Sequence, residues 1–570
     1  MIDRSLVGLD DRQREAASAL RGPVCVLAGA GTGKTRVITH RIAHGVDTGA
    51  YSPGRVMAVT FTTKAAGEMR GRLRALGVPG VAARTFHAAA LAQLNFFWPQ
   101  VAGDAAPAIV GSKVALLGQA ADALGLRLDA PTLRDVAGRI ESRKVSMRTI
   151  AADAAARPHG LPGVELTALM DLQRAYEQVK DQRRQLDFED VLLACAGMLE
   201  SEPRVLAAVR EQYRHFTVDE FQDVSPVQHR LLELWVGERG DLCVVGDASQ
   251  TVYSFAGADP RYLLDFPVRH PEAKVVRLER NYRSDAAVLR VANALMRGRP
   301  GALELVSADA PGPTPTVTAY GDDAAEAAGV AARIAAAVDD GVDPRRIAVL
   351  YRANAQSAPL LSALAARGVA ATVLGGKRFF DLPEVRQALL ALRGAAVAPL
   401  ETSFEATVRD VLRSLGFTDD APPAGGALRD AWEARAALMR LAEEAPPGAT
   451  LRSFTDDLMA RAKDQHEPSL RTVTLATLHA AKGLEWDHVH LVGMSEGLLP
   501  ISYATTFDAI DEERRLAYVG VTRAARTLSV SWAQTSGGRP RQRSRFLQEI
   551  GTDIADARDA RATAAGRSRR

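Results

Sequence analysis

The sequence predicts an α/β protein with two parallel-sheet domains, each interrupted by a mostly helical insertion. Short, nearly continuous apolar runs alternate with longer segments of helical periodicity, which is the pattern of parallel strands that are buried on both faces. These runs fall into two sets, and each set is split by an Ala- and Leu-rich helical block. The chain of 570 residues is long enough for several domains of about 100–200 residues each.

The first set of apolar runs predicts the first domain. Helical block 88–200 divides it, so we expect 1–87 and 201–280 to form one domain around that insertion. The expected strands are 24–29, 56–61, 216–221, 242–247 and 274–279.

The second set predicts a second domain from 281–380 and 471–550, with 381–470 as its helical insertion. The last segment, 551–570, has little apolar content and several arginines, so we expect a disordered basic tail. The expected strands of this domain are 347–352, 370–376, 473–478, 488–493 and 527–532.

Composition excludes several classes of protein. No apolar run reaches the ~18 residues of a membrane span, and the N-terminus lacks the apolar segment of a secretory signal. We therefore expect no membrane partner and a cytoplasmic location. Cys25, Cys195 and Cys243 are far apart, which favours buried, reduced thiols over a disulfide framework or zinc site. The net charge of +3 is too small to indicate nucleic-acid binding by itself.

A glycine-rich stretch, "AGAGTGKT" at 28–35, lies between an expected strand and an expected helix. Small residues let backbone N–H groups converge on a phosphate at the positive end of the helix. Lys34 can reach the β- and γ-phosphates, and the Thr35 hydroxyl can bind Mg²⁺. The alternative is an ordinary glycine-rich turn, and Ala28 stands where the strict pattern has glycine. We predict that ATP and Mg²⁺ bind here, with nucleotide contacts from Ala28, Gly29, Ala30, Gly31, Thr32, Gly33, Lys34, Thr35 and Arg36.

Two carboxylates follow another expected strand in "FTVDEFQDVSPVQ" at 216–228. Asp219 can orient Mg²⁺, and Glu220 can act as general base on the attacking water. An exposed acidic strand end is the alternative, and the presence of the phosphate loop argues against it.

The segment "DEFQD" at 219–223 is identified as the second motif of superfamily 1 helicases, and the chain resembles the UvrD/PcrA/Rep family. Within this family it resembles a shortened second UvrD paralogue of high-GC bacteria. Further matches follow in the family's order over nearly the whole chain: "LDDRQREA" (9–16), "TFTTKAAGEMRGRL" (60–73), "RTFHAAAL" (84–91), "VVGDASQTVYSFAGA" (244–258), "RLERNYRS" (277–284), "TLHAAKGLEW" (477–486) and "DEERRLAYVGVTRA" (511–524).

The resemblance implies two RecA-like motor domains with ATP bound in the cleft between them. It implies that Gln13 reads adenine and that Tyr282 stacks on it. Gln250 would contact the γ-phosphate, which Arg283 and Arg523 would clamp from the second domain. Glu485 would hold the ribose.

The same resemblance implies a DNA track. Phe61, Tyr253 and Phe255 follow expected strands, where aromatic side chains are otherwise often part of the core. If they face the cleft, bases can stack on them irrespective of sequence. Contacts to the DNA backbone or sugars are expected from Thr60, Thr62, His87 and His479.

The expected function is an ATP-dependent 3′→5′ DNA helicase and single-stranded DNA translocase, acting in DNA repair or replication on single strands and 3′-tailed duplexes. The alternative is a non-unwinding translocase that strips proteins or loads a partner. A helicase–nuclease motor is disfavoured because the chain ends soon after its last motif. Insertion 381–470 is short for the family and lacks its Gly-Ile-Gly duplex-gripping loop; "APPAGGALRD" (421–430) has the character of a linker. We therefore expect weak duplex anchoring, with a protein partner or a second copy supplying the missing grip.

Overall fold

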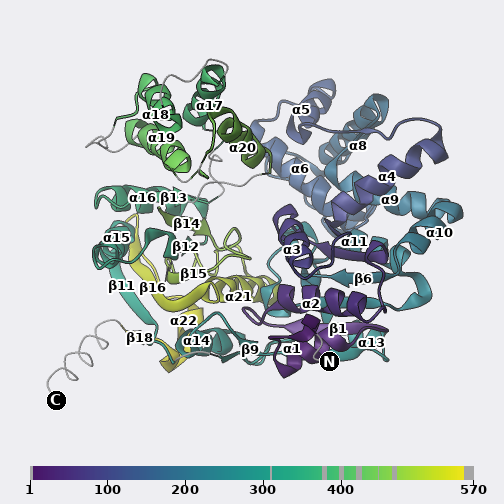
Figure 1. Ribbon diagram of the computed structural model, residues 1–570, viewed down its shortest axis with the longest axis horizontal. Helices are drawn as coiled ribbons and strands as arrows, with labels where there is room; N and C mark the ends of the chain where they lie inside the picture. The colour runs from purple at the N-terminus through teal and green to yellow at the C-terminus, as the bar shows by residue number, and fades with distance from the viewer. Residues whose placement is uncertain are drawn as a thin grey trace. The chain divides into compact units, whose positions relative to one another are not determined.

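The computed structural model describes residues 4–308, 311–374, 380, 382–396, 403–418, 427–443, 445–446, 448–464 and 471–556 (Figure 1). The chain forms two compact units. The first comprises 1–311 with 507–518, and the second comprises 312–506 with 519–570.

The first unit is built on a six-stranded parallel sheet in the order β3-β2-β6-β7-β1-β8. All five predicted strands are confirmed. The additional edge strand β3, with the sequence AART, was not predicted because it is short and half polar. The strands are β1 (Val24–Ala28), β2 (Val56–Thr60), β3 (Ala82–Thr85), β6 (His215–Val218), β7 (Leu242–Gly246) and β8 (Lys274–Leu278).

Two apolar clusters cover the two faces of this sheet. Val24 and Val26 belong to one cluster, and Cys25, between them, belongs to the other. This alternation explains the continuous apolar run, because both faces of the strand are buried. The first cluster packs against α2 (Lys34–Asp47), and the second packs against α4 (Phe86–Ala102), α9 (Phe188–Ser201) and α11 (Pro226–Val236).

The first insertion is helical, as predicted. It has an apolar core of its own that includes Leu117, Ile140 and Leu172. Its principal helices are α5 (Lys113–Ala123), α6 (Ala130–Val145), α7 (Ile150–Ala156) and α8 (Leu166–Arg183).

The first unit continues beyond the boundary expected at residue 281, as far as Pro311. The reason is that the strand after β8, β9 (Arg280–Asn281), is bonded to the glycine-rich loop, where the backbone N–H of Tyr282 donates to the carbonyl of Gly31 at 2.9 Å. Helix α14 (Ala286–Met296), β10 (Val306–Ser307) and most of α21 (Phe507–Val521) belong to the same unit.

The second unit contains a larger sheet, ordered β13-β14-β12-β15-β16-β11-β18, and β17 adds to β16 in the antiparallel sense. The five predicted strands are confirmed; β11 has a single buried residue and was not predicted. Helices α15 (Asp323–Asp339) and α16 (Ser357–Ala365) pack on this sheet. The strands are β11 (Thr316–Asp322), β12 (Ile347–Tyr351), β13 (Ala371–Val373), β14 (Val473–Thr477), β15 (Trp486–Leu491), β16 (Ala524–Ser536), β17 (Arg539–Pro540) and β18 (Ala555–Asp556).

The second insertion is also helical. Helices α17 (Pro383–Ala395), α18 (Phe404–Ser414), α19 (Ala427–Glu443) and α20 (Leu451–Asp464) share one apolar core and form one cluster in Figure 1. Residues 421–426 of the expected linker lie outside the described residues. The rest of that stretch, 427–430, begins α19 and is therefore not linker.

The segment 551–570 was expected to be disordered. Its first residues differ from that expectation, because buried Ile554 leads into β18, which pairs with β11. Residues 557–570 lie outside the described residues. The three cysteines are free and buried, as predicted. Among the described helices, none combines the length and apolarity needed to span a bilayer.

Candidate functional site

The glycine-rich loop joins the end of β1 to the start of α2. Gly31 and Gly33 have φ values of 68° and 85°, which glycine adopts without steric cost. No side chain caps α2, so the N–H groups of its first turn are available to an anion. The Lys34 Nζ donates to the carbonyl of Ala28 at 3.3 Å, which holds the amine over the loop.

Asn281 supports this loop from the other side. Its side-chain Nδ2 donates to the carbonyl of Ala30 at 2.7 Å, and its Oδ1 accepts the backbone N–H groups of Arg283 and Ser284 at 2.8 and 2.7 Å. The side chain is 1 % exposed. The sequence analysis missed this residue, although it lies within the quoted segment "RLERNYRS".

Two predicted nucleotide-binding residues meet at one end of the loop. The Gln13 Nε2 donates to the carbonyl of Thr32 at 2.9 Å, and the Tyr282 hydroxyl donates to the Asp10 carboxylate. Asp10 also accepts the backbone N–H of Gln13 at 2.7 Å. Tyr282 is 43 % exposed, and the Arg280 guanidinium lies over its ring, 5.6 Å from the centroid. Arg36 is exposed nearby in the first turn of α2.

The paired carboxylates directly follow β6. Asp219 is buried, and Glu220 has a φ of 51°, an uncommon conformation for a residue with a side chain. This turn places Glu220 Oε1 4.0 Å from Lys34 Nζ. The Gln222 Nε2 donates to Glu220 Oε2 at 2.5 Å and fixes the carboxylate from the opposite side.

Buried hydrogen bonds connect this carboxylate to the segment after β7. Gln222 Oε1 accepts the backbone N–H of Asp247 at 3.0 Å. Asp247 Oδ2 in turn accepts from Gln250 Nε2 at 2.7 Å and from the Tyr518 hydroxyl of α21 at 3.4 Å. Gln222 is fully buried, and the sequence analysis missed its role.

The predicted DNA contacts differ in accessibility. Phe255 is 66 % exposed, with its ring 6.0 Å from that of half-buried Tyr253. Thr62 is exposed and caps α3 (Thr63–Ala75), next to half-buried Phe61. Thr60 does not fit the prediction of a side-chain contact, because it is the last residue of buried strand β2 and is 1 % exposed.

An aromatic pair extends the candidate contact surface. The His87 ring stacks on Phe188 with 3.8 Å between centroids, and Phe188 is 58 % exposed. Burial lowers the pKa of His87 to about 4, so the imidazole is neutral at pH 7. Phe188 was missed because its segment, "LDFEDVLLACAGML", has the pattern of a core helix.

In the second unit, Arg523 lies close to the segment that carries Glu485. The Arg523 Nη1 donates to the carbonyl of Leu484, the residue before Glu485, at 3.0 Å, and Arg523 is 2 % exposed. His479 follows β14 in the same unit, and burial lowers its pKa to about 4. Arg283 was expected in this unit; it lies in the first, beside the glycine-rich loop.

The fold and the site define the class of α/β proteins with a phosphate loop and paired carboxylates at the ends of parallel strands. Residues 9–271 match the family model of the UvrD/REP helicase N-terminal domain, and residues 276–417 and 433–535 match that of the UvrD-like helicase C-terminal domain. The chain belongs to the UvrD-like helicase family.

Three curated relatives cover nearly the whole chain. ATP-dependent DNA helicase UvrD2 of Mycobacterium tuberculosis (strain ATCC 25618 / H37Rv) is 46 % identical over 576 residues, which is 96 % of this chain and 82 % of that protein. DNA helicase II of Escherichia coli (strain K12) is 31 % identical, with 98 % and 89 % covered. ATP-dependent DNA helicase PcrA of Bacillus subtilis (strain 168) is 28 % identical, with 98 % and 88 % covered. The predicted resemblance to a second UvrD paralogue is confirmed.

Proposed function

We propose that the protein is an ATP-dependent DNA helicase that moves 3′→5′ along single-stranded DNA and acts in DNA repair or replication. The observation that carries this proposal is the 4.0 Å approach of Lys34 Nζ to Glu220 Oε1, since it joins a phosphate-binding amine to a candidate general base. Family membership and the names of the relatives support DNA as the polymer on which ATP hydrolysis drives movement.

Each residue of the site has a distinct task in hydrolysis. The loop's N–H groups and Lys34 bind the phosphates, and Glu220 takes the proton of the attacking water. Gln222 holds the carboxylate in place for that transfer.

Thr35 and Asp219 fit a magnesium site, because they supply a hydroxyl at the start of α2 and a carboxylate at the end of β6. Mg²⁺ usually takes one or two protein carboxylates with phosphate oxygens and waters. When bound, Mg²⁺ neutralises charge on the phosphates.

Gln250 is the candidate sensor of the γ-phosphate. It shares Asp247 with the chain of bonds that begins at Glu220. A change in the hydrogen bonds of Gln250 would therefore be transmitted to the loop that carries Tyr253 and Phe255. The roles implied for Arg283, Arg523 and Glu485 at the phosphate and ribose remain predictions.

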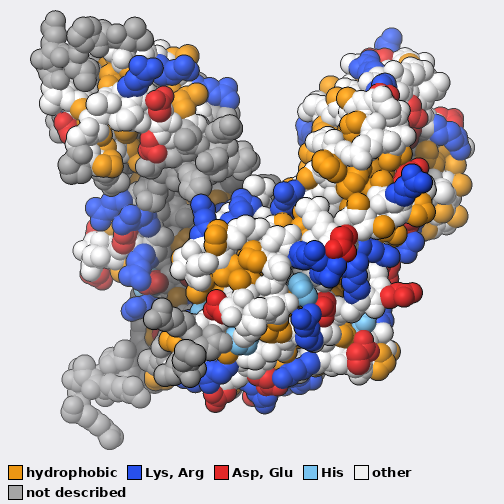
Figure 2. Space-filling view, turned by 45° about the vertical axis from the view of Figure 1, so that its right-hand side comes forward, with side chains coloured by type: hydrophobic (Ala, Val, Ile, Leu, Met, Phe, Trp, Pro, Cys, Tyr) orange, Lys and Arg blue, Asp and Glu red, His pale blue; other side chains and the backbone are white. Residues whose placement is uncertain are grey.

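Stacking on aromatic rings is the proposed mode of DNA binding. Phe255 and Phe188 are the most exposed rings of the candidate surface, and stacking contributes about 1–3 kcal/mol per base. On the face shown in Figure 2, Lys and Arg side chains are interspersed with Asp and Glu side chains. Stacking tolerates any sequence because every base has a π-face.

A non-unwinding translocase is the second candidate, and the short insertion 381–470 favours it. Translocation on single strands should be efficient in either case. The two candidates are separated by comparing translocation with strand displacement on 3′-tailed duplexes of increasing length. We expect isolated monomers to displace short strands and to fail on several hundred base pairs. Processive unwinding by monomers would contradict our interpretation of the insertion.

A further inference from the structure

A second basic site lies at the opposite ends of the same central strands. β1, β2, β6 and β7 are neighbours in the sheet, and an arginine stands at or just before the start of each. The phosphate loop follows the other end of β1, which is five residues long, so the two regions are separated by roughly 16 Å of strand. The arginines are Arg21, Arg55, Arg214 and Arg239.

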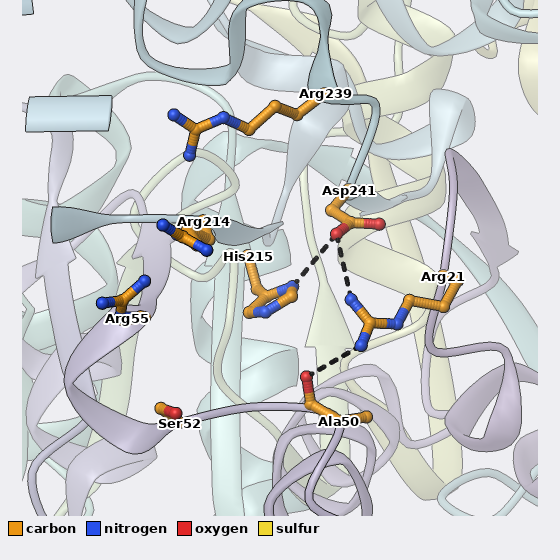
Figure 3. Close-up of a pocket in the computed structure, with 8 residues that line it drawn as sticks. All are labelled: Arg21, Ala50, Ser52, Arg55, Arg214, His215, Arg239 and Asp241. Atoms are coloured by element: carbon orange, nitrogen blue, oxygen red, sulfur yellow. Dashed lines mark hydrogen bonds and ion pairs between the residues drawn. The ribbon is translucent and has the colours of Figure 1, made fainter. Parts of the chain in front are cut away.

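These arginines line a hollow of about 710 Å³ (Figure 3). In the close-up, Arg55 and Arg214 lie to one side of His215, and Arg21 with Asp241 lies to the other. The volume falls within the ~300–1,000 Å³ of small-molecule sites. Four adjacent strands span only about 15 Å, so the hollow suits a compact ligand better than a duplex.

Positive charge exceeds negative charge in this hollow. Arg55 and Arg214 share a single partner, Glu211, at 3.2 and 2.7 Å, and Glu211 lies at the exposed rim. Arg21 is 3.5 Å from Asp241. In the described part of the chain, Arg239 is within ion-pair distance of no carboxylate, although it is close enough to Glu211 to help lower the pKa of that carboxyl, and it donates to the backbone carbonyl of Arg210.

His215 separates the two sides of the hollow. It is 8 % exposed, its ring stacks on Tyr51 at 4.2 Å, and it lines the hollow. Its Nδ1 faces Asp241, with 3.4 Å between the nitrogen and a carboxylate oxygen (Figure 3). His215 therefore turns toward the acidic side of the hollow and leaves the arginine side to a ligand.

We propose that this hollow binds a small polyphosphate, as a free anion or as the phosphate chain of a nucleotide, at a site separate from the phosphate loop. Guanidinium groups match phosphate oxygens in pairs, in geometry as well as charge. Arg55 and Arg214 form one side of the cradle, Arg239 contributes from the next strand, and His215 forms the floor.

The test is calorimetric titration of the full chain with inorganic tripolyphosphate. The Lys34→Ala protein serves as background, because it weakens binding at the phosphate loop. We expect the Lys34→Ala protein to bind tripolyphosphate at one saturable site. Adding Arg55→Gln and Arg214→Gln should weaken this affinity by about tenfold or more, since charge-assisted hydrogen bonds are lost. Adding Arg345→Gln, an arginine of the second unit paired with Asp343, should leave the affinity unchanged. Arg239→Gln, at an exposed position, replaces the double substitution if that protein does not fold.

The outcomes decide between ligands. The same titration with ATP distinguishes the two ligands. Tighter binding of ATP than of tripolyphosphate indicates a nucleotide, the reverse order indicates a free anion, and either result supports the site. The proposal is overturned if tripolyphosphate does not bind the Lys34→Ala protein, or binds regardless of the arginine substitutions. It is also overturned if these substitutions weaken binding of a single-stranded oligonucleotide or of a poly-glutamate peptide instead. Arginine variants that retain Lys34 should keep DNA-stimulated ATP hydrolysis. This result separates the present proposal from the proposed function.

Discussion

The side-chain amide of Asn281 donates a hydrogen bond to the backbone carbonyl of Ala30 at 2.7 Å. This bond ties Asn281 to the middle of the phosphate loop, 251 positions earlier in the sequence. It also explains why Gly31 cannot carry a side chain, because a Cβ there would lie 2.5 Å from the Asn281 amide nitrogen.

Asn281→Ala should therefore impair ATP binding. The carbonyl of Ala30 and the N–H groups of Arg283 and Ser284 lose a buried partner, at about 1–3 kcal/mol for an unsatisfied group. We expect the KM for ATP to rise by about tenfold or more, with a smaller change in kcat. Asn95→Ala, on the exposed face of α4, is the matched control. Steady-state ATPase kinetics check this, and an unchanged KM would show that the loop keeps its shape without Asn281.

Lys34→Ala and Glu220→Gln should separate binding from chemistry. Loss of the Lys34 amine should abolish hydrolysis and weaken nucleotide binding. The amide in Glu220→Gln keeps its shape but cannot accept the proton, so turnover should fall by about 10²–10⁴-fold while binding persists. Nucleotide titration beside ATPase rates tests both. If Glu220→Gln loses nucleotide binding, the carboxylate is structural. Lys274→Ala, at a surface ion pair, is the control.

The exposed rings should couple DNA to hydrolysis. Phe255→Ala and Phe188→Ala should each weaken single-stranded DNA binding by about 1–3 kcal/mol and leave hydrolysis without DNA unchanged. Fluorescence anisotropy with an oligonucleotide, beside ATPase rates with and without DNA, measures the two effects. Phe96→Ala is the control, because Phe96 is also 66 % exposed but belongs to α4 outside the predicted motifs. Equal loss of basal and stimulated rates would assign the rings to stability.

The stability of the protein should decrease in mild acid. Burial lowers the pKa values of His87, His479 and His490 to about 4, whereas an unfolded histidine titrates near ~6.5. Between these values the unfolded chain binds more protons, so the free energy of unfolding falls as pH falls from ~6.5 to ~4. Thermal unfolding at a series of pH values checks this. His87→Gln should make the decline shallower, and greater stability at pH 5 than at pH 7 would contradict the assignment.

The sequence predicted the parts of the site whose chemistry is local. Lys34, Asp219 and Glu220 stand at strand ends within short motifs, so strand–loop–helix patterning alone places them. Asn281 and Gln222 lie in equally short motifs, yet their roles depend on partners that only the folded chain brings close. Gln222, for example, lies in the turn after β6 and reaches Asp247, which follows the neighbouring strand β7.

The differences from prediction have the same origin. Strands β3 and β11 were missed because their exposure is mixed and an apolar run does not mark them. Arg283 was assigned to the second unit because the resemblance implies a γ-phosphate contact from that domain. Hydrogen bonds between its segment and the phosphate loop, which leave no mark on periodicity, keep it in the first unit. Thr60 was expected to contact DNA because the family resemblance implies it, but strand pairing buries it.

Strand displacement from tailed duplexes tests the central claim most directly. A labelled short duplex carrying either a 3′ or a 5′ single-stranded tail is incubated with the protein, Mg²⁺ and ATP. We predict displacement from the 3′-tailed substrate only, and none with the Lys34→Ala protein. Displacement that starts from the 5′ tail, or that proceeds without ATP, would contradict the proposal of an ATP-driven 3′→5′ motor.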